Sequence, residues 1–278
     1  MGFFDFWEDV KDNHEKSKEA RECIQRAKEL VKEGDRIYEA AYDKVQSYAS
    51  ETEYRLKRHM SYKQDIAKEL GGNIGSTLKA FADFHIDEKI ISAPSIQERN
   101  STVKNFRDSL ASCVVSTPFD MPSVLDAFIS DDDYYEAKHQ KDEAKRYKER
   151  MKMERESLYE YKDKMAEIRI FIDEEKSELD SLMEKIRKLT GDLNTGMKKS
   201  TFSSKEAEYL KGIHKIAECI VTLLSTEFLT DGFSINQRYQ NAFSAIKNIN
   251  QNLPYAPSIT DSTTAAAIKK IIDGQIVY

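Results

Sequence analysis

The feature that most constrains the fold is an apolar repeat in residues 137–193. Apolar side chains recur there at alternating steps of three and four, and charged residues fill most other positions. The two interleaved halves of this seam are Ala144, Met151, Leu158, Met165, Ile172, Leu179, Ile186 and Leu193, and Tyr147, Glu154, Tyr161, Ile168, Glu175, Leu182 and Leu189. A heptad repeat sustained over this length predicts a coiled-coil helix.

A second heptad lies upstream, in residues 1–70. Its seven-residue series is Val10, Ser17, Ile24, Val31, Tyr38, Val45, Thr52, His59 and Ile66, with Ala20, Ala27, Gly34, Ala41, Tyr48 and Tyr62 between them. A flanking apolar stripe of Leu30, Ile37, Leu56 and Met60 leads us to expect that this arm packs on more than one helix. Because the arms are of similar length, we expect antiparallel pairing within one chain, and the alternative is a parallel dimer through the second arm.

The composition agrees with long solvated helices. Charged residues make up 33% of the chain, whereas only 10 Gly and 5 Pro are present, too few for the many turns of a sheet-based fold. The sequence therefore predicts an all-α fold: an elongated antiparallel coiled-coil hairpin with a small helical tip and a helical base. The expected parts are arm 1–70, tip 71–136, arm 137–193 and base 194–278.

Local signals refine the tip and the base. GGNIG at 71–75 is expected to stop the first helix, and Ser203 with Glu206 forms a capping box that starts a carboxy-terminal helix. Two further helices are expected around Ile235–Ile249 and Thr263–Ile272. We expect these base helices to pack near an aromatic amino terminus formed by Phe3, Phe4, Phe6 and Trp7.

The sequence offers no case for catalysis, and we expect no catalytic, cofactor-binding or metal-binding residues. The five histidines lack ligand spacing, and Cys23, Cys113 and Cys219 are too far apart in sequence to suggest a zinc cluster. GDLNTGMKKS at 191–200 resembles a phosphate loop, but Met197 stands where the required Lys should directly follow Gly196. We interpret it as a linker.

Three polar residues occupy seam positions, where apolar side chains are usual. These are Glu154, Glu175 and His59. An unpaired buried carboxylate is costly, so we expect Glu154 and Glu175 to pair with Lys or Arg of the other arm and fix the register, or to mark where the arms part. His59 is expected to set the register as a polar seam residue.

The run LVKEGDRIYEAAYDKVQSYASETEYRLKRHM, Leu30 to Met60, resembles the first arm of uncharacterised bacterial helical-hairpin proteins. In that group two charged arms flank a Gly-rich hydrophobic segment, which implies membrane association. Here GGNIG is short and a polar tip replaces the apolar insert, so the resemblance carries over no functional residue.

Together these patterns predict a non-enzymatic, cytoplasmic and bacterial scaffold or adaptor that binds a protein partner and self-associates. One alternative is a peripheral membrane or pore-forming-type helical protein that reaches lipid through Phe3, Phe4, Phe6 and Trp7. Another is an accessory subunit of a nucleotide-driven complex. The net charge of -6 argues against nucleic acid as a partner.

Overall fold

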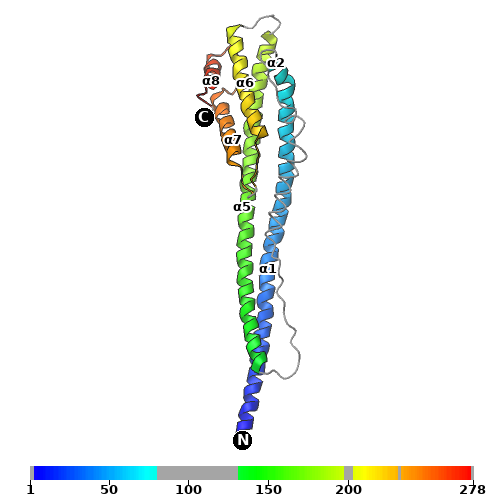
Figure 1. Cartoon of the computed structure of the whole chain (residues 1–278). Helices are drawn as coiled ribbons and strands as arrows, with labels where there is room; N and C mark the ends of the chain where they lie inside the picture. Colours follow the sequence, from blue (N-terminus) through cyan, green and yellow to red (C-terminus); the bar gives the residue numbers. More distant parts are fainter. Residues whose placement is uncertain (1–2, 80–130, 197–202, 231–232, 277–278) are drawn as a thin grey trace. The chain divides into compact units, whose positions relative to one another are not determined.

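The structure, a computed structural model, describes residues 3–79, 131–196, 203–230 and 233–276. Side chains are described over residues 14–78 in the first range and over 133–194 in the second. The elements in order are α1 (Phe3–Glu69), a π-helical turn η1 (Leu70–Ile74), α2 (Gly75–Lys79), α5 (Asp131–Gly196), α6 (Ser204–Ser225), α7 (Gln237–Asn252) and α8 (Ser262–Ile272) (Figure 1). The all-α class is confirmed over these ranges, while most of the expected tip lies outside them.

The chain divides into two compact units, and each takes one length of α1 and one length of α5. The first unit contains Met1–Ala49 and Leu110–Asp163, and the second contains Ser50–Ser109 and Lys164–Tyr278. The pairing of two long helices of one chain is therefore confirmed within each unit. The units cut across both predicted arms.

In the first unit α1 and α5 run parallel. The Tyr134 hydroxyl donates to Glu19 at 2.7 Å, near the beginning of both described helical segments. Further along both helices, the Tyr147 hydroxyl donates to Asp35 at 2.6 Å, and Lys148 pairs with Glu33. Later residues of one helix thus contact later residues of the other.

The second unit has the same direction. Arg169 donates to Thr52 at 2.7 Å, and the Tyr62 hydroxyl donates to Asp180 at 2.7 Å. At the far end of this stretch, Thr77 on α2 contacts Asn194 on α5. Figure 1 shows the later part of α1 and the later part of α5 side by side in this unit.

The predicted antiparallel direction is therefore wrong in both units. A heptad repeat defines which face of a helix is buried, but it leaves the direction of the partner open. The connection between the helices does not force a choice either, because the 51 residues 80–130 can reach about 170 Å when extended, whereas a 66-residue helix is about 100 Å long.

The predicted seam of α5 is correct in detail. All of its expected positions are buried except Glu154, which is half-buried. In α1, Val45, Thr52, His59 and Ile66 are buried as expected, but Ile24, Val31 and Tyr38 are only half-buried. Of the intermediate series, Ala20, Ala27, Gly34 and Ala41 are buried as expected, and in the first unit Cys23 and Leu30 are buried beside them where Ile24 and Val31 were expected. A strict seven-residue repeat therefore fails across the four-residue step from Ala41 to Val45.

The carboxy-terminal helices form in the second unit much as predicted. The capping box is present, with the Ser203 hydroxyl accepting from the Glu206 amide and the Glu206 carboxylate accepting from the Ser203 amide. Asn236 caps α7, and Asp261 caps α8 by accepting from two backbone amides. Packing between α6 and α8 is close, since a Cβ at Gly212 would lie 2.6 Å from Cγ2 of Ile268.

GGNIG kinks the first helix, and a short helix then follows. Backbone angles at Gly72 are non-helical, with φ -84° and ψ -107°, inside the π-helical turn. Helical structure resumes at Gly75 as α2, and Leu70, Ile74 and Leu78 remain buried through the kink. The glycine-rich segment therefore redirects the helix axis without exposing its apolar face.

A buried ionic cluster as the candidate functional site

Four ionisable side chains lie together inside the second unit. His59 and Lys63 stand one turn apart on α1, Glu175 lies on α5, and Tyr239 lies near the start of α7. His59 and Lys63 are each 3% exposed, and Glu175 and Tyr239 are fully buried. We call these four residues the ionic cluster. It lies where three helices meet.

Glu175 is the centre of the cluster. Its Oε2 lies 3.3 Å from Nε2 of His59, and its Oε1 accepts a hydrogen bond from the Tyr239 hydroxyl. Lys63 Nζ lies 4.6 Å from the centroid of the Tyr239 ring, within the range of a cation–π contact. One carboxylate therefore faces an imidazole, a phenol and an ammonium group.

Aromatic rings surround this charge. Phe228 lies 5.4 Å from the His59 ring and 5.0 Å from the Tyr239 ring, measured between centroids. Phe171 contacts Phe228, Tyr239 and Phe243 at 4.9–6.0 Å. The rings exclude water from the carboxylate, so its interactions with neighbouring charges are strong.

Burial by itself raises the pKa of the Glu175 carboxyl. Electrostatic attraction to His59 and Lys63, with the hydrogen bond from Tyr239, outweighs burial and holds that pKa below its ordinary value. Glu175 is thus ionised near neutral pH. Burial and the Glu175 charge raise the pKa of Tyr239 well above its ordinary value, so Tyr239 stays protonated and remains a donor.

The cluster is only partly satisfied. Among the described residues, Nδ1 and Nε2 of His59 and Oε2 of Glu175 are buried without a hydrogen-bond partner. His59 and Glu175 are therefore at ion-pair distance, but the imidazole N–H is not aligned with the carboxylate oxygen. A half-satisfied buried network is a poor source of stability.

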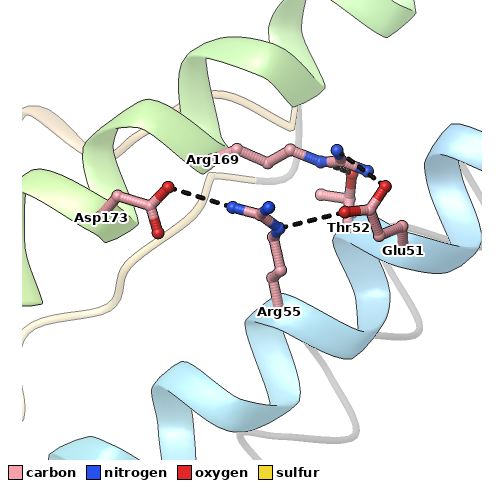
Figure 2. Close-up of polar contacts among 5 residues, drawn as sticks. All are labelled: Glu51, Thr52, Arg55, Arg169 and Asp173. Carbon is pink, nitrogen blue, oxygen red and sulfur yellow. Dashed lines mark hydrogen bonds and ion pairs between the residues drawn. The ribbon is translucent and has the colours of Figure 1, made fainter.

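A second polar network joins α1 and α5 in the same unit. Arg169, only 8% exposed, donates to Thr52 at 2.7 Å and to Glu51 at 3.1 Å. Arg55 in turn bonds Asp173 at 3.0 Å and lies 3.4 Å from Glu51 (Figure 2). These charges alternate in sign between the helices, and they favour one alignment of α1 against α5.

Lys185 attaches the end of α7 to α5. Its ammonium group is buried and donates to the backbone carbonyls of Asn250 at 2.6 Å and Leu253 at 3.0 Å. Those carbonyls lie at the carboxy-terminal end of α7, where a cation is favoured. The Asn250 side chain also accepts from Ser181 and donates to Glu178, both on α5.

The structure brings together two of the three polar seam residues. His59 and Glu175 meet in the ionic cluster, whereas Glu154 lies half-buried in the first unit. Phe3, Phe4, Phe6 and Trp7 fall in the first turns of α1, but their side chains lie outside the described residues.

Sequence reasoning missed Lys63 and Tyr239. Lys63 follows His59 by one helical turn, which was a usable signal, because residues four apart share a helix face. Tyr239 lies on the buried face of α7 with Phe243 and Ile246, and nothing in the sequence relates that face to Glu175.

Comparison with protein-family models finds no match, and comparisons with curated proteins and with solved structures find none either. Within the described ranges, no helix is both long enough and apolar enough to cross a membrane. The same ranges contain no group of three or more His, Cys, Asp or Glu side chains placed to hold a metal ion.

Proposed function

We propose that the protein is a non-enzymatic coiled-coil scaffold that binds a helix of a partner protein through its first unit. The observation that supports this is an apolar shoulder on α1, formed by Ile24 and Val31. Both residues are half-buried and pack at the edge of the seam, Ile24 against Ala20, Cys23 and Ala137, and Val31 against Ala27, Leu30 and Ala144.

The shoulder matters because the seam beside it is made of small side chains. Much of the described seam consists of Ala, which buries little apolar area. A helix with apolar residues both at its seam and beside it has a stripe wide enough for two partners. One partner of α1 in this unit is α5, and the shoulder offers a place for a second helix.

A photo-crosslinking amino acid at Lys28 tests this proposal. Lys28 is exposed and lies on the same helix face as Ile24 and Val31. In cells that express the chain, we expect one discrete adduct that is lost in the double variant Ile24→Glu, Val31→Glu. The matched control is Gln25→Glu, Lys32→Glu, which adds charge at exposed positions of the same helix and should keep the adduct.

The adduct also identifies the type of partner. A mass of twice the chain indicates self-association, and any other discrete mass indicates a different protein. No discrete adduct, or an adduct that both double variants retain, would contradict the proposal.

The membrane alternative rests on the aromatic residues Phe3, Phe4, Phe6 and Trp7 at the start of α1. Aromatic side chains favour the membrane interface, and Trp7 is the single Trp of the chain. Flotation with vesicles, together with a blue shift of Trp7 emission, would favour this alternative. Protein that stays at the bottom of the gradient with unchanged emission would exclude it for those lipids.

A further inference from the structure

The α1–α5 pair of the first unit has two flanks with different contacts. On one flank the Tyr134 hydroxyl donates to Glu19, and Lys148 pairs with Glu33. Those two residues of α1 directly precede seam positions, whereas the two residues of the apolar shoulder follow seam positions by four. In a heptad these places lie on opposite sides of the seam, so the shoulder lies on the other flank. We call that flank the shoulder side.

Charged residues border the shoulder on both helices. The rim of α1 is formed by residues that share the helix face of the shoulder, namely Arg21, Lys28 and Asp35. The rim of α5 is formed by residues that directly precede its seam positions, namely Glu136, Glu143 and Arg150. In a parallel pair these positions of α5 lie on the shoulder side. All rim side chains are exposed except Asp35, which is half-buried and accepts from Tyr147.

The two rims carry opposite charges in the same order. From the amino-terminal end, the rim of α1 is positive, positive and negative, and the rim of α5 is negative, negative and positive. Corresponding rim residues are separated by 115 in sequence, the same separation as in the bonded pairs of the other flank. The rims therefore match in height along the helix pair. Within the chain Glu136 accepts from Gln140, and Oε2 of Glu143 lies 3.8 Å from Nδ1 of His139, so both contact their own helix.

We propose that the partner that covers the shoulder is a second copy of the chain. This inference rests on the proposed function of the shoulder as a helix-binding surface, and it names the occupant. A twofold axis parallel to the helices places α1 of each first unit against α5 of the other, with all four helices running in the same direction. The rims then face each other twice in the dimer, with the opposed pairs Arg21 and Glu136, Lys28 and Glu143, and Asp35 and Arg150.

The same arrangement covers apolar side chains at the surface of the first unit. Met153 is 65% exposed and lies on the helix face of Arg150, at the height of the half-buried Tyr38 of α1. In the dimer, Met153 of one copy contacts Tyr38 of the other. Ile24 and Val31 pass from the edge of a two-helix seam into the interior of a four-helix bundle, where their burial favours association.

A second symmetric arrangement places α1 against α1 and makes the helices of the two copies antiparallel. It can oppose Lys28 to Asp35 and Glu143 to Arg150, but Arg21 and Glu136 then face no opposite charge. The parallel arrangement uses all members of both rims, and the charge pattern therefore favours it.

Sedimentation of the purified full chain at low salt tests the dimer through two variants. The acidic-rim variant is Arg21→Glu, Lys28→Glu, and the basic-rim variant is Glu136→Lys, Glu143→Lys. The wild type should be a dimer. Each variant alone opposes like charges, so its dimer dissociation constant should rise at least about tenfold. The control Gln25→Glu, Lys32→Glu changes exposed positions of α1 outside the rim and should remain a dimer.

A mixture of the two variants is the decisive sample. It opposes an acidic rim to a basic rim on both sides of the twofold axis, so the mixture should form a dimer as tightly as the wild type. In the antiparallel arrangement the mixture would associate no more tightly than either variant alone. The quadruple variant that combines all four substitutions should dimerise again, and it covers the case in which a double variant fails to fold.

The contradicting results differ from those that contradict the proposed function. A monomeric wild type, double variants that still dimerise, or a mixture and a quadruple variant that both stay monomeric would overturn the second copy as the occupant. If the crosslinker at Lys28 then still gives a discrete adduct whose mass is not twice that of the chain, the shoulder binds a different protein, and the proposed function stands without this inference.

Discussion

Glu33 on α1 and Lys148 on α5 form an ion pair, and their sequence separation of 115 equals that of the bonded residues Glu19 and Tyr134. The two pairs lie two heptads apart on both helices. A constant offset of this kind arises only when the helices run in the same direction. These positions flank the seam, where charged residues set orientation and register in parallel coiled coils.

The same register places Arg26 opposite Lys141, one heptad from each of these pairs. Arg26 bonds Glu29 of its own helix instead. We expect Lys141→Glu to create an attraction to Arg26 and to stabilise the chain by about 0.3 kcal/mol, with a larger effect at low salt. Urea unfolding at two salt concentrations measures this, and Lys141→Gln separates gained attraction from lost repulsion. Equal effects of Glu and Gln at position 141 would contradict the register.

Gly212 provides a packing prediction for the carboxy-terminal layer. Its missing Cβ would lie 2.6 Å from Cγ2 of Ile268, an atom of a β-branched side chain that cannot easily move. We expect Gly212→Ala to destabilise the chain by about 1–3 kcal/mol through overpacking. Adding Ile268→Ala should cost less than the sum of the two single effects, because it removes the clash.

Gly191 on α5 is the matched control for that substitution. It is exposed, and no atom lies within 4 Å of a Cβ built there. Gly191→Ala should therefore stabilise the chain by about 0.5–1 kcal/mol through helix propensity alone. Thermal unfolding of both variants compares them, and the account is wrong if the two glycines respond in the same direction.

Much of α5 could be predicted from sequence because each helical turn repeats the same information. Leu158, Met165 and Leu179 are buried where the heptad places them. In α1 the small residues Ala20 and Ala27 form the seam, while the larger Ile24 lies at its edge. Hydrophobicity points to the larger side chain, whereas close helix approach favours the smaller ones, so in the first unit the predicted series with Ala20 and Ala27 is correct and the predicted series with Ile24 is not.

The ionic cluster was only half predictable for a related reason. His59 and Glu175 are conspicuous as polar residues in an apolar seam, and this identified them. Their partner Tyr239 is brought to the seam by the docking of α7 on α5, a contact between distant segments that no local pattern encodes.

Arg169 should be sensitive even to a conservative change. Its guanidinium group donates to both Thr52 and Glu51, and an ammonium group cannot reproduce this planar pair of bonds. We expect Arg169→Lys to cost about 1–2 kcal/mol in the free energy of unfolding. Asp173→Asn is the control, since Asp173 is 67% exposed and should cost less than about 0.5 kcal/mol. Chemical denaturation measures both free energies of unfolding, and comparable losses in Arg169→Lys and Asp173→Asn would contradict this ranking.

Tyr147 supplies a pH prediction for the first unit. Burial and its hydrogen bond to Asp35 raise the pKa of Tyr147 to about 12. The contact therefore contributes fully below the usual value of 10.0 and is lost as pH rises through about 12. NMR titration of ring-labelled tyrosine, assigned with Tyr147→Phe, should show this late ionisation. Asp35→Asn should move it toward the usual value, and a Tyr147 that titrates near 10.0 in the wild type would contradict the contact.

The parallel direction of α1 and α5 is tested most directly by a competition between two cysteines. Native Cys23 shares a buried cluster with Ala137, whereas an antiparallel pairing would bring position 137 close to Ala67 near the end of the first arm. In the double variant Ala67→Cys, Ala137→Cys, treated with a short bismaleimide at high dilution, peptide mapping identifies the linked thiols. The structure predicts a link between positions 23 and 137, and a link between positions 67 and 137 would contradict it.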